Sequence, residues 1–101
     1  MYAKKKSVAC IMQLKDQEDT IGKAIEMFTN TKNAERREDI LALIDVLTIA
    51  FKASEQAFKP FVIDKTVLTE LEEDLESLRQ VVDEGIKTLG VENENGIGVK
   101  N

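Results

Sequence analysis

The stretch ILALIDVLTIAFKASEQAFKPF, residues 40–61, decides the fold. Its apolar side chains recur every three or four residues, which is the spacing of one face of an α-helix. Asn33 is a favourable N-cap before this stretch, and Pro60 cannot donate a backbone hydrogen bond to a continuing helix. The pattern predicts a helix over residues 34–59. The heptad seam is interrupted only by the small Ser54 and consists of Ile40, Ile44, Leu47, Phe51, Phe58 and Phe61.

A second seam follows the proline and predicts a helix over residues 66–89. Asp64 or Thr66 can cap its start, and Gly90 stands where a helix-terminating glycine is common. The remaining residues, 90–101, are rich in glycine and asparagine, and we expect them to form a mobile polar tail. The seam consists of Leu68, Leu71, Leu75, Leu78, Val82, Gly85 and Leu89.

The N-terminal third also has helical spacing, but Glu18 occupies its seam. A single helix over residues 8–29 explains Ile11 and Leu14, and it is the interpretation that we adopt. The alternative begins the helix at Asp16, with an acidic first turn that explains Glu18. Residues 7–14 would then form a separate turn or short strand, so this segment stays open at the level of sequence.

Three helices with short connections predict an all-α fold, an antiparallel three-helix bundle with coiled-coil-like heptad packing and a flexible C-terminal tail. Residues 1–89 form the single domain, and residues 90–101 form the tail. The expected core is Ile21, Ile25, Phe28, Ile40, Ile44, Leu47, Phe51, Phe58, Leu68, Leu71, Leu75, Leu78, Val82 and Ile86.

The composition of the 101 residues restricts the chemistry. Histidine is absent and Cys10 is the single cysteine, which excludes histidine-based acid–base catalysis, Cys-pair zinc sites and an intramolecular disulfide. Cys10 is expected to be a small buried apolar residue. Gly85 is either a glycine that the helix tolerates at a cost of about 1 kcal/mol relative to alanine, or a position that permits close packing against a bulky neighbour. We therefore expect a protein that is not an enzyme, without catalytic residues, cofactor or metal.

The charge is unevenly distributed along the chain. Residues 1–37 carry eight basic and five acidic side chains, whereas residues 38–101 carry six basic and fourteen acidic ones. The net charge of −5 makes nucleic acid an unlikely general partner, and the apolar stretches are too short to cross a membrane. No export signal is recognised, so a cytoplasmic location is expected. Lys4, Lys5 and Lys6 are expected to form a flexible, solvated N-terminal end.

An acidic patch lies at the start of the last predicted helix. Because no histidine or second ligand motif accompanies it, we expect a solvated face or a surface for a basic partner. The patch consists of Glu70, Glu72, Glu73, Asp74 and Glu76.

The helix over residues 34–59 has an apolar arc about twice as wide as the ~100° stripe of a surface helix. Two neighbouring helices within a monomer explain part of it. The other interpretation is an interaction face made of Ala42, Val46, Ile49 and Ala53. The remaining arc is polar and contains Asp45, Thr48, Lys52, Glu55, Gln56 and Lys59.

The function expected from these features is that of a non-catalytic protein–protein interaction module: an adaptor, inhibitor, assembly factor or structural subunit. We expect it to form a weak homodimer through the helix over residues 34–59, with a further protein partner. The alternative is a nucleic-acid-associated accessory protein that uses the basic N-terminal end. Tight binding to nucleic acid that weakens steeply with salt would distinguish the alternative.

Overall fold

The computed structural model describes the backbone of residues 2–100 and the side chains of residues 3–87. Three helices form the described chain: α1 (Tyr2–Asn30), α2 (Ala34–Phe58) and α3 (Lys65–Lys100), with a 3-10 turn, η1 (Lys59–Phe61), between α2 and α3. The described residues contain no strand. The expected all-α class is therefore confirmed.

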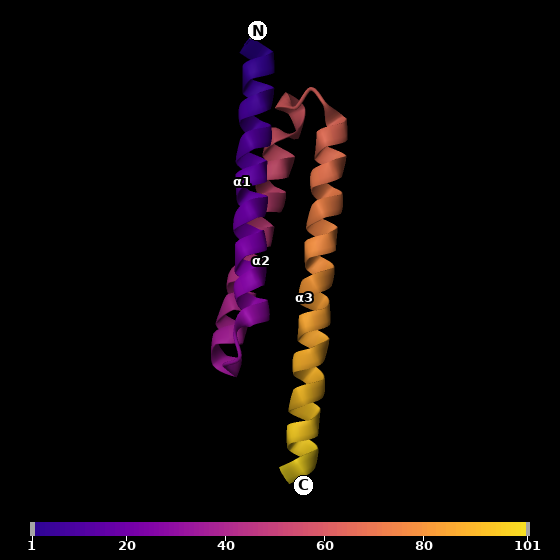
Figure 1. The fold of residues 1–101 in the computed structure, drawn as a ribbon. Coiled ribbons are helices and arrows are strands. Elements are labelled where there is room, and N and C mark those ends of the chain that lie inside the picture. Colours follow the sequence, from indigo (N-terminus) through magenta and orange to yellow (C-terminus); the bar gives the residue numbers. More distant parts are fainter. Residues whose placement is uncertain (1, 101) are drawn as a thin grey trace.

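The chain reverses direction at each of its two connections (Figure 1). Residues 31–33 join α1 to α2, and these two helices pack closely along their length. The turn η1 then brings the chain back to the beginning of α1, where the Ile63 backbone N–H donates a hydrogen bond of 2.9 Å to Ser7 Oγ. From there α3 runs beside the α1–α2 hairpin.

Three of the predicted signals at the helix ends, Asn33, Pro60 and Asp64, act as expected. Asn33 Oδ1 accepts a hydrogen bond of 3.1 Å from the Arg36 backbone N–H, which satisfies one free donor of the first turn of α2. Pro60 lies in η1, where the α-helical pattern of α2 has ended. Asp64 Oδ1 accepts from the Thr66 backbone N–H at 3.0 Å, at the beginning of α3.

The first helix is continuous, which resolves the alternative left open at residues 7–14. It begins at Tyr2, so the expectation that Lys4, Lys5 and Lys6 form a flexible end before the helix is wrong. Lysine has a favourable helix propensity, and two contacts anchor this turn. Ser7 Oγ accepts from Ile63, and Lys6 Nζ lies 4.0 Å from the centroid of the Phe61 ring.

The third helix is longer than predicted, because α3 continues through Gly90 to Lys100. Figure 1 shows it extending past the connection between α1 and α2. In a helix interior, glycine is about 1 kcal/mol less favourable than alanine and asparagine about 0.7 kcal/mol less favourable, so these residues weaken a helix without preventing it. The predicted mobility of the tail, residues 90–101, lies outside the residues whose side chains the structure describes.

The predicted core is largely confirmed. Ten of its members are buried: Ile21, Ile25, Phe28, Ile40, Ile44, Phe51, Leu68, Leu71, Leu75 and Val82. Leu47, Phe58 and Leu78 are partly buried and pack against them. The prediction was wrong at Ile86, whose side chain is 41% exposed. The core also contains Leu14, Ala24 and Val62, which the predicted core left out, and Cys10, whose burial was predicted separately.

The exposure of Ile86 follows from the residue before it. Gly85 takes the inward position on α3, and a Cβ atom built there would lie 2.5 Å from Cε2 of Phe28 on α1. Of the two interpretations of Gly85, close packing against a bulky neighbour is the one that the structure supports. Because successive helical residues are about 100° apart, Ile86 is directed away from this contact.

Candidate functional site

The predicted interaction face is exposed on α2. All four of its residues, Ala42, Val46, Ile49 and Ala53, are accessible, and the side chains of Val46 and Ile49 are 62% and 69% exposed. Their spacing of four, three and four residues forms one stripe along the helix. Ile44, Thr48 and Phe51 are buried on the other side of α2. The bundle therefore leaves this stripe uncovered, and the outer part of the wide apolar arc is not explained by packing within the chain.

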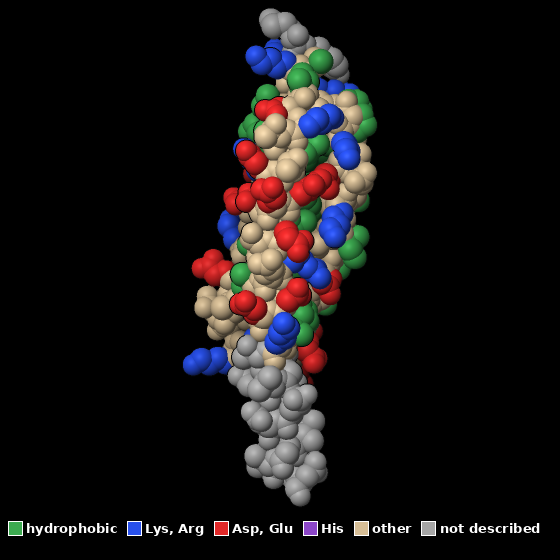
Figure 2. Space-filling view, turned by 90° about the vertical axis from the view of Figure 1, so that its right-hand side faces the viewer, with side chains coloured by type: hydrophobic (Ala, Val, Ile, Leu, Met, Phe, Trp, Pro, Cys, Tyr) green, Lys and Arg blue, Asp and Glu red, His purple; other side chains and the backbone are tan. Residues whose placement is uncertain are grey.

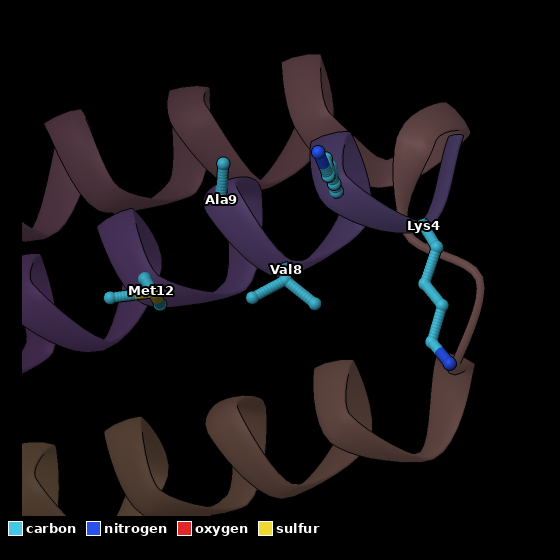
Figure 3. A pocket seen from close by; sticks show the side chains of 5 residues that line it. Lys4, Val8, Ala9 and Met12 are labelled. Atoms are coloured by element: carbon cyan, nitrogen blue, oxygen red, sulfur yellow. The ribbon is translucent and has the colours of Figure 1, made fainter. Parts of the chain in front are cut away.

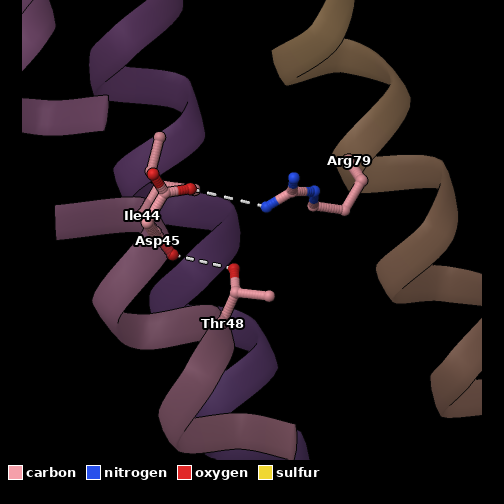
Figure 4. A network of polar contacts seen from close by, with 4 residues as sticks. All are labelled: Ile44, Asp45, Thr48 and Arg79. Atoms are coloured by element: carbon pink, nitrogen blue, oxygen red, sulfur yellow. Dashed lines mark hydrogen bonds and ion pairs between the residues drawn. The ribbon is translucent and has the colours of Figure 1, made fainter. Parts of the chain in front are cut away.

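A charged rim borders the interaction face on the side of α3. Asp45 Oδ1 lies 3.5 Å from Arg79 Nη1, and Thr48 Oγ1 donates a hydrogen bond of 2.7 Å to the Ile44 carbonyl oxygen (Figure 4). Both members of the ion pair are substantially exposed, so it adds little stability. Ile49 lies in the same shallow groove, which is lined by Asp45, Thr48, Ile49, Lys52, Glu76, Arg79 and Asp83.

The acidic patch is exposed but is not a single surface. Figure 2, which looks onto α3, shows acidic side chains along this helix. Glu72 and Glu76 line a groove between α2 and α3, whereas Asp74 lines a groove between α1 and α3. Two sides of α3 therefore present Glu72 and Asp74 to different helices.

Glu55 was placed on the polar arc of α2 by its sequence position, but it is buried, with 7% of its surface exposed. Its Oε2 atom has no hydrogen-bond partner. Burial raises the pKa of Glu55, and a hydrogen bond with Glu72 and the charge of Glu72 raise it further, against the opposing charges of Lys59 and Lys52. Thr48 is likewise buried, and its hydrogen bond to the backbone satisfies its hydroxyl.

Glu18 forms the corresponding site on α1. Its Oε2 atom is buried without a hydrogen-bond partner, and it shares a groove with Asp74 and Asp19. Burial raises the pKa of Glu18 to about 7, the charges of Asp74 and Asp19 act in the same direction, and Lys15 opposes them. The glutamate in the predicted seam is therefore a partly buried acid facing a second acid.

The two glutamates lie at the same level of the bundle. Gln17 Nε2 donates a hydrogen bond of 3.0 Å to Ser54 Oγ, which joins α1 to α2 directly beside Glu18 and Glu55. We call Glu18, Glu55, Glu72 and Asp74 the carboxyl layer. Two breaks in the predicted seams, Glu18 and Ser54, were the sequence signals for it. Nothing in the spacing identified Glu55, because its burial depends on how closely α3 approaches.

A further groove lies near the beginning of α1. It is apolar at its centre, and Figure 3 shows Lys4 and Val8 directed from α1 toward α3. Val8 and Met12 are both exposed. The lining residues are Lys4, Lys5, Val8, Ala9 and Met12. The basic N-terminal end therefore combines exposed lysines with an apolar surface.

Other chemistry finds little support among the described residues. Cys10 is buried, as expected. No group of three or more His, Cys, Asp or Glu residues within the described part of the chain is arranged to hold a metal ion. None of the described helices combines the length and the apolar character needed to cross a membrane.

Comparison with known proteins adds no assignment. No protein-family model, no curated protein and no solved structure matches the chain. The function of the molecule must therefore be inferred from its own residues, of which the exposed stripe on α2 and the carboxyl layer are the most distinctive.

Proposed function

We propose that the protein is a non-catalytic, cytoplasmic protein–protein interaction module that forms a weak homodimer through α2. The scaffold in this proposal is an antiparallel bundle with heptad packing, and its outer surface serves as an adaptor, inhibitor, assembly factor or structural subunit. The observation that carries the proposal is the exposed apolar stripe Ala42, Val46, Ile49 and Ala53.

A second copy of the chain fits this stripe because its pattern is self-complementary. Small residues, Ala42 and Ala53, stand at its ends, and larger ones, Val46 and Ile49, stand at its centre. An antiparallel pair of α2 helices, related by a two-fold axis, would place Val46 against Ile49 of the second copy and Ala42 against Ala53. Symmetric pairing of one surface with itself is the commonest form of association.

The size of the stripe sets the strength of the dimer. Burial of a few hundred Å² of apolar surface is worth several kcal/mol at about 25 cal/mol per Å². Association itself costs about 4 kcal/mol or more in lost translational and rotational freedom. The difference supports a weak dimer. A tighter complex would need additional surface, such as the apolar groove of Val8 and Met12.

Sedimentation of the wild type at micromolar concentration tests the proposal, with Ile49→Glu as the disrupting variant. Thr20→Glu is the matched control, because it introduces the same charge at an exposed position on α1. We expect a concentration-dependent dimer for the wild type and for Thr20→Glu, and a monomer for Ile49→Glu. A monomeric wild type refutes the dimer, and a dimer that survives Ile49→Glu places the interface elsewhere.

The second candidate function, nucleic-acid association, is supported by one observation. Lys4 and Lys5 are exposed on a helical turn at the basic end of α1. In this case the affinity for DNA or RNA falls steeply with added salt, and Lys4→Gln together with Lys5→Gln lowers the salt dependence. Absence of binding at low salt excludes this function.

A further inference from the structure

The carboxyl layer places like charges on both sides of α3. Glu18 comes from α1 and Glu55 from α2, and each has one buried carboxyl oxygen without a hydrogen-bond partner. Glu18 shares its groove with Asp74, and Glu55 shares its groove with Glu72. Two ionised carboxylates at such a position repel each other, whereas a protonated carboxyl can donate a hydrogen bond to its ionised neighbour.

The surrounding charges do not neutralise the layer fully. Glu18 faces Asp74 from α3, with Asp19 and Lys15 on its own helix. Glu55 faces Glu72 from α3, with Lys52 on its own helix and Lys59 in η1, and Glu76 and Arg79 of α3 line the same groove. From α1, the uncharged Gln17 reaches this level and donates its hydrogen bond to Ser54.

The third helix is the element that such repulsion would move. The helices α1 and α2 pack closely against each other, and the Gln17–Ser54 hydrogen bond joins them at the level of the layer. The third helix makes fewer close backbone approaches and is attached through side chains, including the exposed ion pair of Arg79 with Asp45. Electrostatic repulsion within the carboxyl layer therefore weakens the interface between α3 and the α1–α2 hairpin.

We propose that the carboxyl layer is a pH-responsive latch that holds α3 on the α1–α2 hairpin when Glu18 and Glu55 are protonated and loosens α3 when they ionise. The latch is a property of one chain and does not depend on the proposed dimer. On opening, a glutamate that is protonated in the docked state regains its ordinary pKa and releases its proton to water at neutral pH.

The direction of the pH dependence follows from the pKa values. A raised pKa means that the docked state binds more protons than the open state, so docking weakens as pH rises. For Glu18 this weakening begins near its ordinary pKa of 4.5 and is complete above about 7. Glu55 contributes in the same direction, because its pKa is also raised.

Amide hydrogen exchange, corrected for the intrinsic effect of pH, measures the opening of α3 separately from α1 and α2. In the wild type we expect the protection factors of α3 to fall by about tenfold or more between pH 5 and pH 7, while those of α1 and α2 change less. The double variant Glu18→Gln/Glu55→Gln keeps the size of the side chains and stays neutral. We expect its α3 to remain protected across this range.

Two further variants complete the test. Glu73→Gln is the matched control, because Glu73 is an exposed acid on α3 that lines neither groove of the layer, and it keeps the wild-type pH dependence. Glu72→Gln/Asp74→Asn removes the opposing charges from α3 and reduces the pH dependence by less than the hairpin variant does, because burial, the largest cause of both raised pKa values, remains. The latch is overturned by a double hairpin variant that loses α3 protection as the wild type does. It is also overturned if α1 and α2 lose protection together with α3.

Discussion

Two glycines allow the energetic effect of packing to be separated from that of helix propensity. Gly22 and Gly85 both lie within helices, so replacement by alanine gains about 1 kcal/mol of helix propensity at either position. Around Gly22 a new Cβ atom would meet nothing within 4 Å. At Gly85 it would lie 2.5 Å from Cε2 of Phe28. Because the substitution is the same, the difference in stability between the two variants isolates the contact with Phe28.

The magnitude follows from the displacement that the contact requires. Carbon atoms in contact are normally ~3.5–4.0 Å apart, so the buried Phe28 ring must move by about 1 Å. Overpacking of this kind costs about 1–3 kcal/mol. We therefore expect Gly22→Ala to stabilise the protein by roughly 0.5–1 kcal/mol. We expect Gly85→Ala to lie about 1–3 kcal/mol below it in the free energy of unfolding.

Urea unfolding followed by circular dichroism measures both values, and a double-mutant cycle identifies the cause. In a Phe28→Leu background the ring is absent, so Gly85→Ala and Gly22→Ala should have nearly equal effects. Equal stabilisation by the two alanines in the wild-type background would refute the close approach of α3 to Phe28. A difference that persists in the Phe28→Leu background would assign it to another neighbour of Gly85.

Two further predictions concern the core and a helix cap. Leu75→Ala removes a buried side chain and should lower the free energy of unfolding by about 2–5 kcal/mol. Ile49→Ala, at an exposed position, should change the free energy of unfolding little in the monomer. Urea unfolding measures both values, and a small effect of Leu75→Ala contradicts the place of Leu75 in the core. Asn33→Ala removes the acceptor for the Arg36 backbone N–H and should cost about 1 kcal/mol, whereas Asn33→Asp should retain most of the stability. Thermal unfolding measures both variants, and an unchanged stability of Asn33→Ala would show that the cap contributes nothing.

The fold was predictable where a residue acts through its own helix. Ile44, Phe51 and Leu75 recur with the heptad, and Asn33 and Pro60 act on the backbone beside them, so their spacing and chemistry were sufficient. Glycine at position 90 was misleading, because α3 passes through it. A C-cap glycine is a tendency, and the sequence contains no proline after it to enforce an end.

The candidate sites were predictable only in part, because they depend on distances between helices. The interaction face around Ile49 could be derived from the periodicity of α2 alone, and its exposure agrees with that derivation. Glu55 could not be identified in this way. It stands on the polar side of its own helix and becomes buried only because Glu72 and Leu75 of α3 lie across the same groove.

Because Cys10 is buried, the reactivity of its thiol reports the local opening of α1. It is the one thiol of the chain and lies within the N-terminal half of α1, packed into the core. A thiol-specific reagent reacts with the exposed thiolate, so labelling at a fixed pH must wait for this part of α1 to open. When closing is faster than labelling, the ratio of the observed rate to that of a free thiol is the equilibrium constant for opening. The unmodified sequence therefore allows the equilibrium constant for the opening of α1 to be measured without an introduced label.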